Sequence, residues 1–209
     1  MFSNSPYVVE AKPSFDPSRV LISGDGLSAA GVLASFPTSF LIDTRHAGVA
    51  NLDVIIQDPQ GNYVTPIIRD NGDGTYLVTY TPEDIGVYTV RIRFGGQDVP
   101  GSPVYVQAHP TGDASKCVIA EGNDQYILLN DTCVITVDAV KAGHGNVTCR
   151  IRSPQGGDCD IDIADNGDGT FSIHYTPRVQ GSYALTIKFG GNLIPNGHFT
   201  QEVCLPVLL

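Results

Sequence analysis

The chain has 209 residues, 42% of them hydrophobic, and its 12 Lys plus Arg against 22 Asp plus Glu give a formal net charge of −10. This acidic balance argues against nucleic acid and against direct membrane binding, because both kinds of partner select basic patches. The length is enough for two small domains that each bury a core, and no apolar run approaches the roughly 18 residues of a membrane-spanning helix.

One stretch of sequence occurs twice, at a spacing of 95 residues. Asp-Asn-Gly-Asp-Gly-Thr at 70–75 returns at 165–170, and the Tyr-Thr-Pro, Gly-x-Tyr and Phe-Gly-Gly that follow it return at the same spacing. Identical turn residues and aromatics at one offset indicate the same turns and the same core built twice. We therefore expect a lead-in (1–13), repeat one (14–109), repeat two (110–204) and a tail (205–209).

The lead-in resembles the end of repeat one. Residues 5–11, Ser-Pro-Tyr-Val-Val-Glu-Ala, match Ser-Pro-Val-Tyr-Val-Gln-Ala at 102–108. We predict the last strand of a preceding repeat here, with a disordered terminus as the alternative. The first residues lack the basic and apolar regions of a secretion signal, so none is expected.

Short alternating or β-branched runs, separated by turn residues about every 8–12 positions, are typical of an antiparallel sandwich. Repeat one has seven such runs, at 19–23, 39–44, 52–57, 63–69, 75–80, 87–94 and 104–107. Repeat two has seven as well, at 116–120, 133–137, 147–152, 159–164, 170–175, 182–189 and 199–203. No stretch sustains a 3.6-residue period, so almost no helix is expected. The prediction is an all-β chain of two tandem seven-stranded immunoglobulin-like β-sandwiches.

Packing alone is expected to hold each core. Antibody-type domains carry a disulfide and a tryptophan in the core, but Val90 and Leu185 stand at the second cysteine position and the chain has no Trp. Tyrosines near the start of the sixth strand, Tyr88 and Tyr183, are retained. We interpret the five cysteines, all in repeat two, as reduced thiols of an intracellular protein.

Neither catalysis nor metal binding is expected, and no cofactor. The five histidines fall mostly in loops or on outward strand positions, and no nucleophile and base can be paired. The Asp-Asn-Gly-Asp-Gly steps place carboxylates together as a calcium loop does, but alternate ligand positions counted from Asp70 fall on Gly72 and Gly74. A hairpin turn explains every residue of the step.

The repeated motifs together resemble filamin-type immunoglobulin-like repeats. They include Asp-Pro-Ser-Arg (16–19), Asp-Ala-Ser-Lys (113–116), Phe-Leu-Ile-Asp-Thr-Arg-His-Ala-Gly (40–48) and Val-Pro-Gly-Ser-Pro (99–103). Repeat two departs from the pattern at 194–198, where it has Ile-Pro-Asn-Gly-His. The sequence therefore does not define where the last strand of repeat two begins.

The resemblance implies a cytoplasmic segment of an actin-crosslinking, mechanosensing rod that is also a scaffold. Its partners would be cytoplasmic tails of membrane receptors and extended peptides of cytoskeletal proteins. Such peptides add to the strand matched here by 52–57 and insert side chains into the groove beside the strand matched by 63–69. Actin would be bound only through parts of the full-length protein that this sequence does not contain.

The first-repeat groove is the stronger candidate site, because an exposed sheet edge is a template for strand addition. Its expected residues are Asp53, Ile55 and Gln57 on one strand and Val64, Pro66 and Ile68 on the other. The weaker second-repeat groove has Thr148 and Arg150 opposite Ile161 and Ile163. Arginines on an edge strand protect it against pairing, so we rank repeat one first.

Two other functions remain open from the sequence. The Asn130-Asp131-Thr132 and Asn146-Val147-Thr148 sequons are compatible with an extracellular adhesion or carbohydrate-binding tandem. The repeats are alternatively pure spacers that bind nothing. The linker at 108–114 is short, so we also hypothesise that one repeat docks on the other and masks a strand edge until tension separates them.

Overall fold

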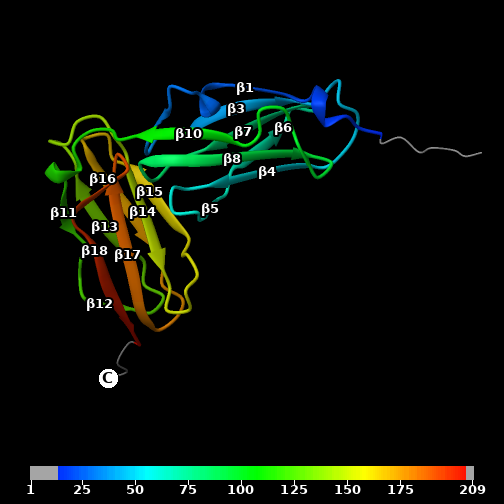
Figure 1. Cartoon of the computed structure of the whole chain (residues 1–209). Coiled ribbons are helices and arrows are strands. Elements are labelled where there is room, and N and C mark those ends of the chain that lie inside the picture. Colours follow the sequence, from blue (N-terminus) through cyan, green and yellow to red (C-terminus); the bar gives the residue numbers. More distant parts are fainter. Residues whose placement is uncertain (1–13, 206–209) are drawn as a thin grey trace, which may run out of the picture.

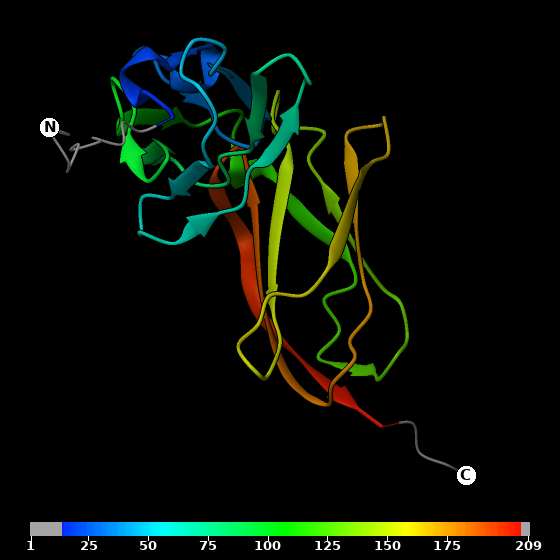
Figure 2. The same cartoon turned by 90° about the vertical axis from the view of Figure 1, so that its right-hand side faces the viewer.

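The computed structural model describes residues 14–205, so the strand predicted in the lead-in and most of the tail lie outside the described residues. Two β-sandwiches follow one another, and their long axes are steeply inclined where they meet (Figures 1 and 2). The predicted all-β fold of two tandem immunoglobulin-like sandwiches is confirmed. No helix in the described part of the chain is long and apolar enough to cross a membrane.

Repeat one consists of two sheets. Their orders are β1-β3-β7-β6 and β2-β10-β8-β4-β5, and β9 pairs with β8. The strands are β1 (Leu21–Ser23), β2 (Val32–Leu33), β3 (Thr38–Asp43), β4 (Leu52–Gln57), β5 (Tyr63–Val64), β6 (Ile67–Asp70), β7 (Thr75–Tyr80), β8 (Gly86–Phe94), β9 (Gln97–Asp98) and β10 (Val104–His109).

Repeat two is built in the same way. Its sheet orders are β11-β13-β16-β15 and β12-β18-β17-β14. The strands are β11 (Val118–Glu121), β12 (Tyr126–Leu128), β13 (Cys133–Asp138), β14 (Val147–Arg152), β15 (Ile161–Asp165), β16 (Thr170–Tyr175), β17 (Gly181–Phe189) and β18 (Asn192–Cys204). Short 3-10 turns cover Pro17–Arg19, Asp25–Leu27 and Ala114–Lys116.

Several strand predictions differ from the structure. The strands predicted at 19–23 and 116–120 both start later, because an aspartate before each accepts a backbone N–H and caps a 3-10 turn, as Asp16 does from Ser18 at 3.1 Å. The single strand predicted at 63–69 is two, β5 and β6, because Pro66 has no N–H to donate to a ladder. In repeat two, β18 runs unbroken from Asn192, and a register shift between Thr186 and Lys188 accommodates the extra residues.

The core follows the predicted alternation. Alternate residues of β8 and β17 are buried, and they are Tyr88, Val90, Ile92, Phe94, Tyr183, Leu185, Ile187 and Phe189. The Tyr88 hydroxyl accepts a hydrogen bond from the backbone N–H of Asp84 at 3.0 Å, which fixes the β7–β8 loop (residues 81–85) against the sandwich. Tyr183 bonds the backbone of Val179 in the same way at 3.1 Å.

All five cysteines are free, and two of them, Cys117 and Cys149, belong to the core of repeat two. Burial raises the pKa of Cys117 to about 11 and that of Cys149 to about 12. A thiol with so high a pKa stays protonated at neutral pH and is a poor nucleophile. These two cysteines therefore act as small apolar side chains.

Candidate functional site: two strand edges and the seam between the repeats

The edge of β4 is partly unpaired. β4 pairs with β8 along its whole length, but with β5 only at Ile56 and Gln57. Within the described residues, the backbone from Leu52 to Ile55 therefore has no strand partner on its second side. Free N–H and C=O groups in this arrangement can hydrogen-bond an extended peptide.

The first three candidate residues lie on the outer face of β4. Asp53 is exposed, whereas Ile55 and Gln57 are half-buried. Ile55 is opposite Arg91 of β8, so its side chain lies on a face that also carries a cation. These three residues border the free edge and do not point between the two sheets.

The three residues expected on the opposite wall are separated by the break at Pro66. Val64 pairs with Ile56 and packs on the core, and Pro66 is half-buried between β5 and β6. Ile68 pairs with the buried Val78, so it faces the inner side of its sheet, and yet it is 43% exposed. Of the three, Ile68 thus offers the most apolar surface at the opening between the sheets.

Sequence reasoning missed two neighbouring apolar residues. Tyr63 is 75% exposed and Ile67 is 73% exposed. With Arg150 and Asp158 of repeat two they line a cavity of about 390 Å³ between the repeats. Alternation within 63–69 already placed Ile67 on the face opposite to Ile68, which is the signal that could have identified it.

The edge of β14 in repeat two is also open. Beyond its pairing with β17, its backbone contacts among residues 14–205 are a bridge from Arg152 to Asp158 and a hydrogen bond from the Cys159 N–H to the Ile151 carbonyl at 2.8 Å. Thr148 and Arg150 lie on the outer face, half-buried, as expected. Their predicted partners across the groove, Ile161 and Ile163, are half-buried and pack against the core.

The two repeats are joined by a hydrogen-bonded contact that we call the seam, formed by residues 34–36 and 81–85 of repeat one and residues 144–150 and 186–191 of repeat two. Asn146 donates its backbone N–H to the Ser35 hydroxyl and its side-chain amide to the Ser35 carbonyl, both at 3.1 Å. Ser35 is 3% exposed, so these are shielded bonds. They join the repeats in a defined orientation.

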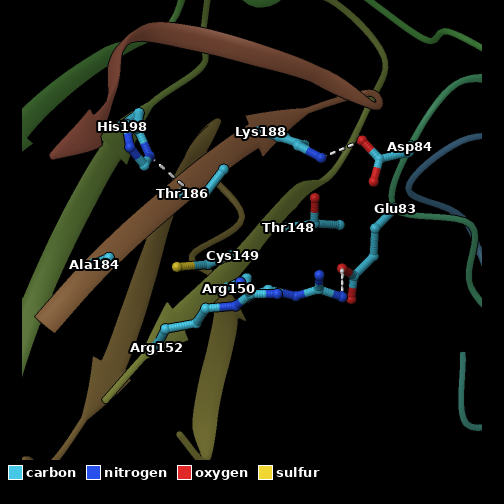
Figure 3. A pocket seen from close by; sticks show the side chains of 10 residues that line it. All are labelled: Glu83, Asp84, Thr148, Cys149, Arg150, Arg152, Ala184, Thr186, Lys188 and His198. Atoms are coloured by element: carbon cyan, nitrogen blue, oxygen red, sulfur yellow. Dashed lines mark hydrogen bonds and ion pairs between the residues drawn. The ribbon is translucent and has the colours of Figure 1, made fainter. Parts of the chain in front are cut away.

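Charged side chains form the second half of the seam (Figure 3). Lys188 of β17 pairs with Asp84, and Arg150 of β14 lies 3.9 Å from Glu83. Thr148 lies between these two ion pairs in the figure. The β7–β8 loop of repeat one therefore covers part of the outer face of repeat two. Among the described residues, no hydrogen bond or ion pair connects repeat two to the free edge at Leu52–Ile55.

Docking at the seam is expected to strengthen as the pH falls. Partial burial in the docked chain raises the pKa of Glu83 above its usual range, while Arg150 and Lys188 of repeat two act in the opposite direction. The docked state therefore binds a proton more tightly than the undocked state, and this contribution is complete below the ordinary glutamate pKa of about 4.3 and lost as the pH rises through the raised value. Glu83 is still 46% exposed, so we expect a change of only a few-fold.

Glu83→Gln tests this dependence. Small-angle scattering of the two-repeat chain at pH 7 and pH 5 should show a smaller change in compactness for Glu83→Gln than for the unmodified chain. Glu121→Gln, an exposed residue of β11, serves as the control and should keep the unmodified response. An equal pH response in the Glu83→Gln variant would contradict the assignment.

One of the two sequons is incompatible with the seam. The Asn146 amide nitrogen that a glycan would occupy donates to Ser35, and the Thr148 hydroxyl is shielded from solvent. A glycan at Asn146 would thus separate the repeats. The sequon at Asn130 is exposed and places no such restriction.

The repeated Asp-Asn-Gly-Asp-Gly-Thr step forms a turn whose carboxylates bond their own backbone. Asp70 accepts the Gly72 N–H at 2.8 Å and Asp73 accepts the Thr75 N–H at 2.9 Å. Asp165 and Asp168 make the matching bonds in repeat two, both at 2.9 Å. No cluster of metal-ligating side chains occurs among the described residues.

Comparison with known proteins places both sandwiches in one family. The Filamin/ABP280 repeat matches residues 14–105 and again residues 111–200. Filamin-C of Mus musculus is 45% identical over 212 residues, covering 97% of this chain and 8% of that protein. Filamin-A of Drosophila melanogaster is 36% identical over 197 residues, covering 94% of this chain and 9% of that protein.

The chain thus spans under a tenth of the length of these relatives. Among solved structures, the Lin-41 filamin domain aligns with a TM-score of 0.39 at 20% identity, covering 46% of this chain and 96% of that one. The two family matches each fall on one of the two sandwiches, and together they cover most of the sequence. The chain belongs to the filamin family and consists of two consecutive filamin repeats.

Proposed function

We propose that this chain is a non-enzymatic rod segment of a filamin-like, actin-crosslinking scaffold of the cytoplasm and cytoskeleton. Two consecutive family repeats and 45% identity to Filamin-C over nearly the whole chain support this proposal. Contact with actin itself is assigned to parts of the full-length protein outside these repeats. The seam supports a mechanosensing role, since a pulling force along the chain would separate the docked repeats before either sandwich unfolds.

Repeat one binds extended peptides from receptor tails or cytoskeletal proteins by strand addition at the free edge of β4. The unpaired backbone from Leu52 to Ile55 is the observation that carries this proposal. Ile68, 43% exposed at the opening between the sheets, supplies an apolar contact for one of the alternate side chains that the peptide would direct toward this opening. Asp53 and Gln57 border the same edge and would contact the polar side of the peptide.

A peptide titration tests the proposed site. We expect a ten-residue peptide of alternating valine and serine to shift the backbone amide resonances of Leu52–Ile55 and Ile68 in the NMR spectrum of the two-repeat chain. Ile68→Asp should weaken binding at least about tenfold, because an apolar contact is replaced by a charge that must be desolvated. Ile67→Asp is the matched control, since this neighbour is 73% exposed and faces the opposite side.

Each alternative result has a distinct meaning. Shifts confined to β14 and β15 would reverse the ranking of the two grooves. Equal effects of Ile67→Asp and Ile68→Asp would exclude the opening between the sheets as the contact. No shift with any extended peptide would leave the spacer function as the better description.

A further inference from the structure

The turn that follows β4 in repeat one and the turn that follows β14 in repeat two have the same backbone. Residues 58–61 are Asp-Pro-Gln-Gly, and residues 153–156, at the matching positions, are Ser-Pro-Gln-Gly. In each turn the N–H of the fourth residue donates to the carbonyl of the first, at 3.0 Å in repeat one and at 2.9 Å in repeat two. The final glycines have φ angles of 87° and 84°. The first residue, aspartate or serine, is therefore what distinguishes the two turns.

In repeat one, the aspartate carboxylate organises the turn. Asp58 is 7% exposed and accepts the backbone N–H of Gln60 at 2.9 Å and that of Asn62 at 2.8 Å. It also accepts the side-chain amide of Asn62 at 2.8 Å. A carboxylate in this position satisfies backbone donors that the turn itself leaves without partners.

In repeat two, the matching donors lack this acceptor. The backbone N–H groups of Gln155 and Gly157 donate to no group within residues 14–205. Ser153 is half-buried, and its hydroxyl reaches water and likewise makes no hydrogen bond within that range. The hydroxyl oxygen lies 3.9 Å from the place where a Cβ would stand on Gly157. An acceptor group attached to this hydroxyl would therefore be within reach of both N–H groups.

The charge beside the turn changes together with the aspartate. Asp58 and Glu83 line the same cavity in repeat one. Their matches in repeat two, Ser153 and Arg178, both line a cavity of about 540 Å³. Arg178 belongs to the β16–β17 loop (residues 176–180), is exposed and makes no ion pair or hydrogen bond within residues 14–205. An anion on Ser153 would thus share its cavity with a free cation, where repeat one has a second acid.

We infer that Ser153 is a phosphorylation site, with the phosphate held by the N–H groups of Gln155 and Gly157 and by the guanidinium of Arg178. The proline at position 154 makes it a substrate for a proline-directed serine kinase. In the reaction, the Ser153 hydroxyl oxygen bonds to the γ-phosphorus of Mg-ATP and loses its proton. The bond from that phosphorus to the β-phosphate oxygen breaks, and ADP leaves. The phosphate supplies the negative charge and the acceptor oxygens that the Asp58 carboxylate supplies in repeat one.

Other titratable groups of the cavity act against the phosphate or are neutral toward it. They are Asp158, Asp160, Asp162 and His174. Both Asp158 and Asp160 are exposed, so water and salt screen their repulsion. The bonds from backbone N–H groups and from an arginine to a phosphate are short and charge-assisted, which makes them the stronger contribution. Phosphorylation is therefore expected to stabilise the turn.

A kinase reaction tests the site. The two-repeat chain is incubated with Mg-ATP and a proline-directed serine kinase, and the phosphate is located by mass spectrometry of the peptides. Ser153 should carry it, and Ser153→Ala should abolish most of the incorporation. Ser102 is the matched control, because it is also half-buried and followed by proline, but its hydroxyl already accepts the Ile92 N–H at 2.8 Å. No phosphate on Ser153, or as much on Ser102 as on Ser153, would overturn the inference.

Two measurements on the phosphorylated chain test the residues that hold the phosphate. The melting temperature of repeat two, followed through the amide resonances of β17, should rise by about 4 °C on phosphorylation. Ser153→Asp, which installs the residue of repeat one, should reproduce part of this rise, and Ser153→Ala should not. In phosphorus NMR, Arg178→Gln should raise the second pKa of the phosphate, ordinarily about 6, because a cation that favours the dianion is removed. An unchanged melting temperature would overturn the preformed acceptor site, and a larger pKa change for Arg152→Gln than for Arg178→Gln would overturn the role of Arg178.

Discussion

Replacing Phe189 by alanine is expected to lower the free energy of unfolding of repeat two by about 3–5 kcal/mol. The side chain is 1% exposed and packs edge-on against Phe171, with ring centroids 6.4 Å apart. The ring also covers Gly112 and Gly145, whose lack of side chains leaves room for it. Its removal leaves a cavity that two glycines cannot fill. Chemical denaturation followed by circular dichroism measures the loss.

Val140 of repeat two provides the control. It is 60% exposed in the same repeat, and Val140→Ala should change the free energy of unfolding by no more than about 0.5 kcal/mol. The amide resonances of repeat one should persist in Phe189→Ala at denaturant concentrations that unfold repeat two. Equal losses for the two variants would show that the Phe189 site is not a packed core.

Reversing the charge of Asp84 is expected to open the seam. Asp84 and Lys188 are 21% and 23% exposed, so the pair is largely shielded from water. Asp84→Lys places two ammonium groups together in this site and should cost about 3 kcal/mol, which favours repeats that tumble separately. Small-angle scattering should then show a larger radius of gyration, and NMR relaxation should show shorter correlation times for each repeat.

The double variant Asp84→Lys with Lys188→Asp is the matched test, because it restores opposite charges at the same two positions. It should recover most of the compact form. A single variant as compact as the unmodified chain would show that the Ser35 and Asn146 bonds hold the seam by themselves. A double variant as extended as the single one would show that the loss came from a change in the loop and not from the pair.

Much of the fold is local in origin and was predictable from the sequence. Four of the strands, β4, β7, β14 and β16, have the predicted bounds, because short runs of β-branched residues end at Gly, Pro and Asx turns. The break within 63–69 is also local in origin, because Pro66 interrupts the strand between β5 and β6. The β18 strand was harder, since only the bulge opposite Thr186 and Lys188 allows it to continue.

The seam was hypothesised as a docking contact, but its residues were not predictable. Ser35 and Asn146 are 111 residues apart, and Asp84 and Lys188 are 104 apart. Neither pair recurs 95 residues away, because one partner of each differs between the repeats: Ser35 matches Asn130, and Asp84 matches Val179. Periodicity identifies what the repeats share, so it reveals their cores and turns and gives no information about a contact made once.

The hydrogen bond from the Asp84 N–H to the Tyr88 hydroxyl connects the interior of repeat one to its neighbour. Tyr88 is fully buried. The β7–β8 loop that it anchors begins at Thr81, two residues before the acidic side chain of Glu83. The direction in which repeat two leaves repeat one is therefore set partly by how the centre of repeat one is packed. A conservative change deep inside repeat one can therefore alter the angle between the two repeats while every surface residue stays the same.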